Sequence, residues 1–212
     1  ARRVERQFVE SIAGGIDEAD GLIGASVATR ALADQILRVA PSLGPVFISG
    51  EAGSGKSLVA RAVHARSRRR TGPFVTLDCA TTPTEKLVAD LSEPDGALTS
   101  ADGGTLFLDE VGHLADAAQL ALMRFLDTGE IAGFDGGRRL SVRVIASSRR
   151  PLDELSGPSG LRQDLYFRLN VLTLAVPPLS ERSEDIPALV DVMVRQINRD
   201  SGSRHPRLTA AA

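Results

Sequence analysis

Short apolar runs alternate with longer amphipathic segments along most of this chain. Each apolar run has the length of a buried strand, and the segments between the runs carry apolar residues at helical spacing. The apolar runs cover residues 46–49, 74–77, 105–108, 142–146 and 171–176. Strands that alternate with helices in this way usually form a parallel sheet covered by helices. The pattern therefore predicts an α/β fold, with a parallel sheet inside a three-layer domain.

Helix signals fill the intervals between these strands. Pro41 ends one helical pattern and Gly129 ends another, because proline and glycine are common helix terminators. The sequence Thr82-Pro83-Thr84-Glu85 offers an N-cap, a proline at the first helical position and a capping-box glutamate, which predicts one short helix before the third strand. The predicted helices outside that interval cover residues 2–12, 26–40, 58–64, 116–128 and 183–199.

Composition sets a few limits on the function. A chain of 212 residues with 42% hydrophobic and 25% charged residues suits one main globular domain. A net charge of −2 gives no overall attraction to nucleic acid, and the basic residues at 66–70 are typical of a solvated loop. Cys79 is a single cysteine, which excludes an intrachain disulfide. Without a signal peptide or a run of about 18 apolar residues, we expect a cytoplasmic protein and no membrane partner.

A complete phosphate-binding loop follows the first strand. The residues from Gly50 to Ser57 read G-E-A-G-S-G-K-S, which fits the pattern G-x-x-x-x-G-K-[ST]. In such a loop the backbone N–H groups surround an anion, the lysine bridges the outer phosphates, and the serine hydroxyl joins Mg²⁺. The sequence therefore predicts that ATP and Mg²⁺ are the ligands. The predicted nucleotide contacts are Gly50, Glu51, Ala52, Gly53, Ser54, Gly55, Lys56, Ser57 and Leu58.

Two acids follow the third strand, at the edge where parallel α/β sheets bind ligands. Asp109 is predicted to hold Mg²⁺ together with Ser57, and Glu110 to orient and deprotonate the attacking water. An apolar strand followed by two acids is a weak signal when it stands alone. Together with the phosphate loop it indicates a P-loop ATPase of the AAA+ class.

Several longer blocks resemble one family within that class, the bacterial enhancer-binding proteins, whose central AAA+ domain activates transcription with sigma-54. The resemblance covers residues 22 to about 190. The blocks are Leu22-Ile23-Gly24, the phosphate loop with Glu51, Gly72-Pro73-Phe74-Val75, residues 101–110, residues 162–170, Pro177-Pro178-Leu179, Glu181-Arg182 and Glu184-Asp185-Ile186-Pro187.

This resemblance implies a ring of subunits, commonly a hexamer, that hydrolyses ATP. It places Ile23 near the adenine, and it matches Arg162 and Arg168 to the arginines that reach into the active site of the neighbouring subunit. It also implies RNA polymerase or a sigma factor as a possible partner. DNA would be bound through a helix-turn-helix domain that lies outside these residues.

The sequence departs from the family at the loop that grips sigma-54, which normally reads GAFTGA. Residues 96–101 read G-A-L-T-S-A, but they run directly into the turn before the acidic strand and leave no returning limb. We interpret the projecting loop as deleted. The expectation is a regulator that is not a conventional sigma-54 activator.

Three smaller departures affect sensing and coupling. The stretch 129–142, a second partner-facing loop in relatives, is about two residues short. Ser148-Arg149 stands where the family usually has Thr-Asn as its nucleotide sensor, and Asp78 replaces an asparagine that restrains the catalytic glutamate. An ionised aspartate lacks the donor and would repel Glu110. Because the catalytic set is otherwise intact, we expect hydrolysis to be retained, at a slow rate.

With the resemblance, the chain divides into three parts. Residues 1–20 are predicted to be an N-terminal linker helix, 21–178 the AAA+ α/β core, and 179–212 the start of a helical lid subdomain. The chain ends in Ala210-Ala211-Ala212 at the beginning of a predicted helix, so we expect it to be a piece of a longer regulator.

Two other functions stay open. A nucleotide-responsive oligomerisation scaffold, acting with the ordinary sigma factor or as a repressor, is favoured by the deleted loop and opposed by the catalytic set. An AAA+ remodeller outside transcription is the third possibility, because the partner-facing loops are atypical.

Overall fold

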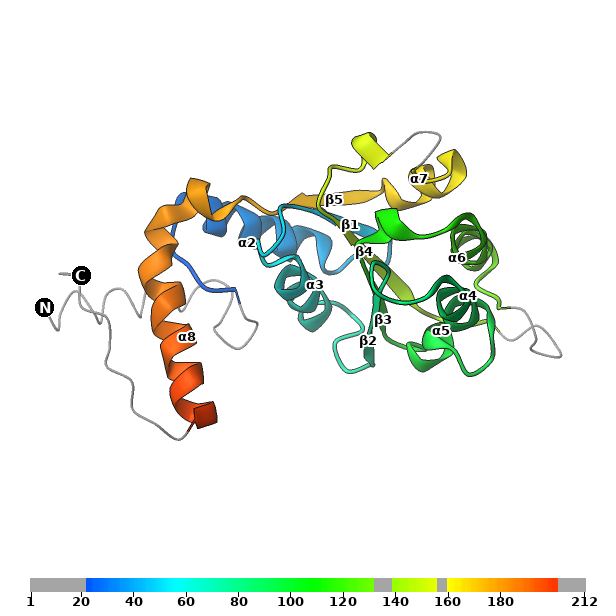
Figure 1. Ribbon diagram of the computed structural model, residues 1–212, viewed down its shortest axis with the longest axis horizontal. Coiled ribbons are helices and arrows are strands. Elements are labelled where there is room, and N and C mark those ends of the chain that lie inside the picture. The colour runs from blue at the N-terminus through cyan, green and yellow to red at the C-terminus, as the bar shows by residue number, and fades with distance from the viewer. Residues whose placement is uncertain (1–21, 132–138, 156–159, 202–212) are drawn as a thin grey trace, which may run out of the picture.

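The computed structural model describes residues 22–131, 139–155 and 160–201 and contains one sheet of five strands (Figure 1). The order across the sheet is β2-β3-β4-β1-β5, and every pairing is parallel. The strands are β1 (Val46–Ser49), β2 (Phe74–Asp78), β3 (Thr105–Asp109), β4 (Arg143–Ser148) and β5 (Leu172–Ala175). The predicted α/β fold with a parallel sheet is confirmed, and so are all five predicted strands.

Helices cover both faces of this sheet and extend beyond it. They are α2 (Val27–Val39), α3 (Lys56–Ala65), α4 (Thr84–Ser92), α5 (Ala97–Ser100), α6 (Asp116–Thr128), α7 (Gln163–Leu169) and α8 (Ile186–Ser201), with 3-10 helices η2 (Val111–His113), η3 (Asp153–Leu155) and η4 (Leu179–Asp185). Neither α5 nor α7 is predicted by the hydrophobic pattern. The helix predicted over 2–12 lies outside the described residues.

Two helix boundaries differ from the prediction. Helix α4 begins at Thr84 with Pro83 in the N-cap position and no side-chain cap, so the predicted cap at Thr82 is wrong. The last helix begins at Ile186 and not at residue 183, because the chain first forms η4. Helix α2 agrees closely with the pattern, and its Ser26 hydroxyl accepts the N–H of Thr29 at 3.1 Å.

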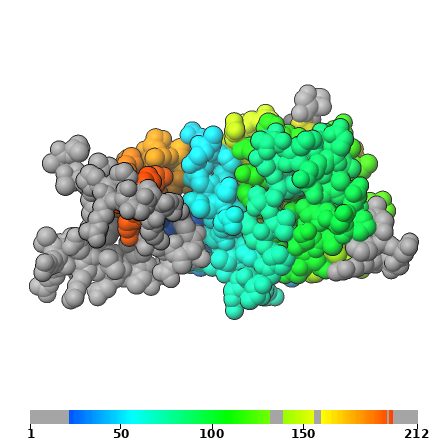
Figure 2. Space-filling model, turned by 60° about the horizontal axis from the view of Figure 1, so that its bottom comes forward, coloured from blue at the N-terminus to red at the C-terminus, as the bar shows by residue number. Residues whose placement is uncertain are grey.

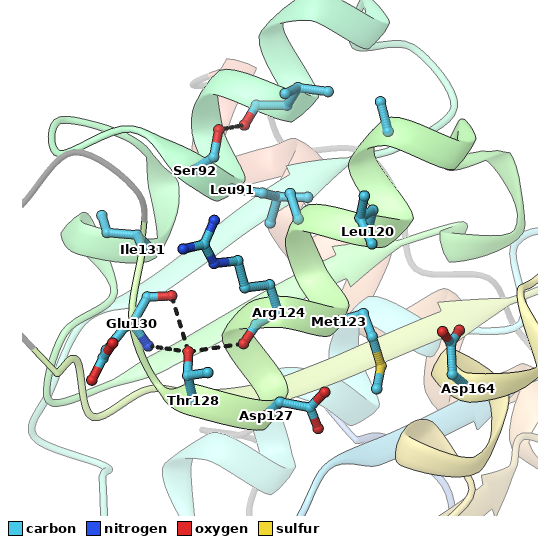
Figure 3. A pocket seen from close by; sticks show the side chains of 13 residues that line it. Leu91, Ser92, Leu120, Met123, Arg124, Asp127, Thr128, Glu130, Ile131 and Asp164 are labelled. Atoms are coloured by element: carbon cyan, nitrogen blue, oxygen red, sulfur yellow. Dashed lines mark hydrogen bonds between the residues drawn. The ribbon is translucent and has the colours of Figure 1, made fainter. Parts of the chain in front are cut away.

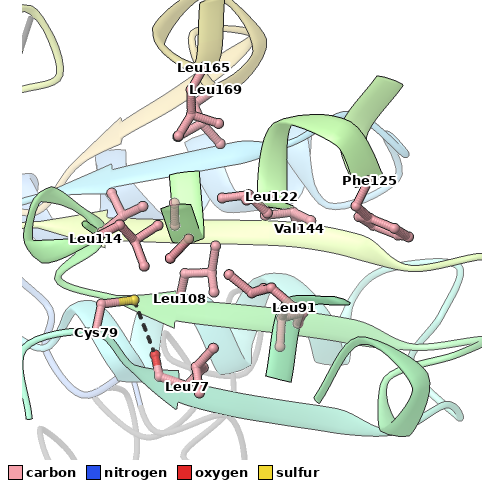
Figure 4. Packing of buried hydrophobic residues seen from close by; sticks show 14 of the residues in the cluster. Leu77, Cys79, Leu91, Leu108, Leu114, Leu122, Phe125, Val144, Leu165 and Leu169 are labelled. Carbon is pink, nitrogen blue, oxygen red and sulfur yellow. Dashed lines mark hydrogen bonds between the residues drawn. The ribbon is translucent and has the colours of Figure 1, made fainter. Parts of the chain in front are cut away.

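The strands separate two apolar layers. In β1, Val46 and Ile48 pack with α2 and α3, while Phe47 points to the opposite face and joins the cluster under α4, α5, α6 and α7. This alternation follows from the two-residue period of a strand. Figure 4 shows the second layer, where Leu108 of β3 packs among leucines from the helices above it. Sheet and helices thus form the three layers that the sequence predicts.

Cys79 lies at the edge of the layer in Figure 4, where its Sγ contacts the carbonyl oxygen of Leu77 at 3.7 Å. Burial raises the pKa of the thiol to about 12, with a smaller contribution from the nearby charges of Asp78, Asp109 and Glu110. The thiol is therefore protonated near neutral pH, and Cys79 serves as a small core residue.

The chain between β2 and β3 is packed against the core through α4 and α5. After α4 a short turn leads into α5, whose Leu98 is 0% exposed, and Ala101 beside it is buried as well. The next residues turn directly into β3, where the N–H of Thr105 donates to the carbonyl of Pro73 at 2.8 Å. Four of the residues 96–101 are therefore buried against the core, and no projecting loop occurs in this fully described interval.

Helix α8 leaves the core at the end of the molecule opposite α4, α5 and α6 (Figure 1). It is amphipathic, and Met193 and Ile197 are exposed along it. Among the residues that the structure describes, no helix has both the length and the apolar content needed to cross a membrane.

A buried carboxylate joins the base of α8 to the start of α2. Asp185 accepts the N–H groups of Ala25 and Ser26, each at 2.8 Å, and the hydroxyls of Ser26 at 2.8 Å and Thr29 at 2.6 Å. Gly24 has a φ of 147°, and a Cβ there would lie 2.4 Å from the Asp185 carboxyl carbon, so glycine is required at this approach. Burial alone would raise the pKa of Asp185, but these hydrogen bonds outweigh burial and hold it below its usual value.

We predict that Asp185→Asn lowers the free energy of unfolding by about 3 kcal/mol at pH 7, because an amide replaces a charged acceptor of four hydrogen bonds. The folded-state pKa lies below the unfolded value of about 3.9, so the stabilisation is complete above that pH and is lost as the pH falls through the folded pKa. Urea unfolding between pH 7 and pH 3 should show the difference from the parent shrinking below about pH 4. Glu184→Gln, an exposed neighbour, is the control and should change stability little; an equal loss would contradict this role of Asp185.

Candidate functional site

The phosphate loop connects β1 to α3 at the carboxyl edge of the sheet. Gly55 precedes α3 with a φ of 101°, a left-handed conformation that glycine adopts without strain. Lys56 begins the helix, and its Nζ donates to the carbonyls of Gly50 at 3.0 Å and Glu51 at 3.2 Å. The space-filling view shows the chain around residue 50 at the surface, between the α8 end and the bulk of the core (Figure 2). Residues 51–53 are exposed before the N-terminus of α3, and a helix N-terminus of this kind favours an anion.

The acidic pair lies beside this loop. The Nζ of Lys56 is 3.1 Å from Oε1 of Glu110, and the two side chains are only 7% and 13% exposed. The Ser57 hydroxyl lies 3.4 Å from Oδ2 of Asp109. Four residues that are predicted from two separate motifs therefore converge at one point.

Glu110 has a φ of 57°, the only left-handed conformation of a non-glycine residue in the described part of the chain. Such a conformation costs on the order of 1 kcal/mol or more and persists only where surrounding contacts hold it. Its N–H donates to the hydroxyl of Ser147 at 3.2 Å, and its carbonyl accepts the N–H of His113 at 3.0 Å. These bonds turn the glutamate side chain away from the strand direction and toward the phosphate loop.

Ser147 was not predicted as a site residue, yet it contacts both acids. Its hydroxyl also bonds to Oδ1 of Asp109. It reaches them because β4 lies between β1 and β3 in the sheet, so the carboxyl end of β4 separates the phosphate loop from the acidic pair. A serine near the end of a strand is too common a signal to identify this role from sequence.

Arg149 follows β4 and contacts Glu110 with both its backbone and its side chain. Its N–H donates to Oε2 of Glu110 at 3.1 Å, and its Nε lies 3.5 Å from Oε1. The Asp78 carboxylate does not bond to Glu110. It accepts the N–H groups of Ala80 and Thr81 at 2.9 and 3.1 Å. A hydrogen bond from the Thr81 side chain is the main cause that lowers the pKa of Asp78, so this carboxyl group is ionised at neutral pH.

Arg182 of η4 is a second contact that the sequence did not single out for the site. Its guanidinium donates to the carbonyl of Ser54 in the phosphate loop at 2.6 Å. Ile23, predicted to lie near the adenine, is half-buried just before Gly24, in the segment that Asp185 holds. The base of α8 is therefore tied to the phosphate loop and to the start of α2.

The two predicted trans-acting arginines lie apart from this site. Arg162 forms an ion pair with Asp164 at 2.8 Å, and Arg168 forms one with Asp127 of α6. Their side chains are 43% and 54% exposed, respectively. Within the described residues neither arginine contacts the phosphate loop, so the fold does not bring them into the site of their own subunit.

A separate groove of about 560 Å³ runs between α4 and α6 (Figure 3). Leu91, Leu120 and Ile131 form apolar walls, and Asp127 and Asp164 lie along its rim. None of its lining residues belongs to the phosphate loop or to the acidic pair. Its volume therefore gives no reason to move the candidate site away from the carboxyl edge of the sheet.

A phosphate loop after β1, an acidic pair after β3 and the strand β4 between them define a P-loop NTPase domain of the AAA+ class. Residues 22–175 match the family described as the Sigma-54 interaction domain. The chain belongs to this family. The predicted resemblance to the central AAA+ domain of sigma-54-dependent regulators is thus confirmed.

Relatives and solved structures agree with this assignment. The chain is 39% identical over 205 residues to the response regulator protein PilR of Pseudomonas aeruginosa, covering 90% of this chain and 46% of PilR. It is 43% identical over 183 residues to the transcriptional regulatory protein ZraR of Klebsiella oxytoca, covering 80% of this chain and 41% of ZraR. NtrX from Brucella abortus in complex with ADP superposes with a TM-score of 0.82 at 35% identity, covering 98% of this chain and 48% of NtrX. The chain spans about half the length of these relatives or less.

We predict that Ser147→Ala lowers the free energy of unfolding by about 2 kcal/mol, because it removes one hydrogen bond from each of two adjacent acids. Urea unfolding measures the difference. The control is Ser49→Ala on the adjacent strand β1, where the side chain is half-buried and makes no hydrogen bond to a residue that the structure describes. Equal losses in the two variants would show that Ser147 does not hold the left-handed turn at Glu110.

Proposed function

We propose that this chain is an ATP-hydrolysing module of a bacterial transcriptional regulator. The observation that carries the proposal is the convergence of Lys56, Ser57, Asp109 and Glu110 beside an open helix N-terminus. NtrX, similar over nearly the whole chain, has been solved with ADP and with ATP, which supports the same ligand here. The nucleotide would lie along the loop from Gly50 to Leu58, with its base on the side of Ile23.

The residues present fit a magnesium ion. Ser57 and Asp109 place a hydroxyl and a carboxylate oxygen 3.4 Å apart, and oxygen ligands of this kind suit a hard cation. When bound, the ion would neutralise negative charge that develops on the phosphate oxygens. Ser147 holds the other oxygen of Asp109, so the carboxylate is oriented toward Ser57.

The proposed hydrolysis begins when Lys56 exchanges Glu110 for the phosphate oxygens of the nucleotide. Its ammonium group now pairs with Glu110 and two loop carbonyls, and phosphate oxygens would compete for the same donors. Glu110 would then be free to accept a proton from a water molecule that attacks the terminal phosphate. The water oxygen forms a new bond to the terminal phosphorus, and the bond between that phosphorus and the leaving ADP oxygen breaks.

We further propose that assembly completes the site. Arg162 and Arg168 are exposed, and surface ion pairs contribute little free energy, so both arginines can leave their carboxylate partners at small cost. An arginine supplied by a neighbouring subunit is worth roughly 10³ to 10⁵ in rate for phosphoryl transfer. The proposed partner is therefore a second copy of this chain, arranged head to tail in a ring.

A conventional role in sigma-54 activation is less well supported. Ala97, Leu98 and Ala101 are buried against the core, so this interval offers no projecting element to grip a sigma factor. Residues 132–138 of the second partner-facing loop lie outside the described part of the chain. The same packing favours the second candidate function, a nucleotide-responsive scaffold in a regulator that acts with the ordinary sigma factor or as a repressor. DNA would be recognised by another domain of the full-length protein in either case.

The first test is phosphate release by the full-length protein with Glu110→Gln beside it. We expect the substitution to lower the rate at least about 100-fold while ATP binding is preserved, because the amide keeps the shape of the side chain but cannot accept the proton. The parent rate per subunit should rise with protein concentration if neighbouring subunits complete the site. Equal rates in parent and variant would refute the role of Glu110, and tight binding without turnover at any concentration would favour the scaffold.

A mixing experiment tests whether the arginines act across subunits. Lys56→Ala and Arg168→Ala proteins should each lose turnover, but an equal mixture should regain activity in about a quarter of its sites, where an intact loop faces an intact arginine. Phosphate release measures the recovery. Arg68→Ala, an exposed arginine after α3, is the control and should keep its activity alone. Two inactive proteins that stay inactive when mixed, although they assemble together, would contradict an action in trans.

Purified transcription separates the two regulatory roles. We expect the full-length protein to form no open complex with sigma-54 polymerase at a promoter that it binds, because residues 96–101 form a short turn and helix against the core and no projecting loop. A sigma-54 activator that carries the projecting loop serves as the positive control. Open-complex formation that depends on ATP would overturn the expectation.

A further inference from the structure

The carboxyl end of β4 places an arginine directly on the proposed general base. The N–H of Arg149 donates a hydrogen bond to Oε2 of Glu110 at 3.1 Å, and its Nε lies within ion-pair distance of Oε1 at 3.5 Å. A carboxylate with a hydrogen bond at one oxygen and a cation beside the other rotates less freely than a carboxylate with a single contact.

The other groups near Glu110 cannot provide this orientation during turnover. Lys56 pairs with Oε1 only while it is not bound to phosphate, and Ser147 binds the backbone N–H and not the carboxylate. Asp78 carries a negative charge and is bonded to Ala80 and Thr81. Once Lys56 is drawn to the nucleotide, Arg149 is the cationic side chain left on Glu110 among the described residues.

The contact has little value for stability. The Arg149 side chain is 63% exposed, and an ion pair in this position contributes little to folding because water screens it. The backbone part of the contact is fixed by the pairing of β4 with β1 and β3 and survives substitution. The side chain therefore affects the orientation and charge of Glu110 far more than the fold.

We propose that Arg149 is a positioning residue, which holds the Glu110 carboxylate toward the attacking water from within the same subunit. The proposal rests on the hydrolytic function proposed above. It assigns a cationic side chain at the end of β4 to the water-activating step, separately from Arg162 and Arg168, which would act on the phosphates of a neighbouring subunit.

The test uses the full-length protein at a concentration where the parent turns over. Arg149→Ala should lower kcat about 10-fold, less than the loss of the base itself, because the backbone N–H still holds one oxygen. The dissociation constant for ATP and the unfolding midpoint should stay unchanged, and Arg149→Lys should restore part of the rate. Arg150→Ala is the matched control, since that exposed neighbour donates to Ser148 only through its backbone.

A double-substitution cycle separates positioning from phosphate binding. In the Glu110→Gln background, Arg149→Ala should produce no further loss of the residual rate, because the residue acts through Glu110. A further loss there, together with weaker binding of ATP than of ADP, would overturn the proposal and place Arg149 on the terminal phosphate. An unchanged or raised kcat in Arg149→Ala would overturn it as well. A parent without turnover would instead refute the hydrolytic function.

Discussion

The parallel pairing of β4 between β1 and β3 is the constraint on which the candidate site depends. Its register sets Ser49 beside Ser148 and Leu108 beside Ala146, so the three strands end at nearly the same level. The N–H of Gly50 donates to the Ser148 carbonyl at 3.2 Å, which ties the start of the phosphate loop to the same strand. A slip of one residue in β4 would turn its side chains to the opposite face and remove Ser147 from the acids.

On the proposed function, nucleotide binding would exchange the partner of Lys56 in the central ion pair at this edge. Lys56 and Glu110 are both largely buried, and two charges withdrawn from water are stable only when each stays paired. Phosphate groups offer Lys56 a stronger partner, but they also leave a buried carboxylate without its ammonium ion. The N–H and Nε of Arg149 meet that requirement from the strand end. On the proposed function, nucleotide binding would draw Lys56 away from Glu110, and Arg149 would remain as the cation beside the Glu110 carboxylate.

The sequence predicts the parts of the site that lie inside continuous motifs and misses those that depend on strand order. The phosphate loop and the pair Asp109-Glu110 are recognisable because each set of neighbours carries its own chemistry. The roles of Ser147 and Asp185 arise from contacts 38 and 160 residues apart along the chain. Hydrophobic periodicity indicates a parallel sheet but not which strand lies at its centre. The helix α5 is missed for a related reason, since four residues are too short for a periodic signal.

Three arginines with proposed roles in hydrolysis differ in the contacts that hold them. Arg149 is bonded through its own backbone to Glu110 of the same subunit, while Arg162 and Arg168 lie in exposed ion pairs on α6 and α7. An isolated subunit would thus contain an oriented base but would lack the charge that stabilises the transferred phosphoryl group. On the proposed function, such a division would make hydrolysis depend on assembly and not on the folding of the site. Any signal that changes how subunits meet would then control the rate without altering the residues that bind the nucleotide.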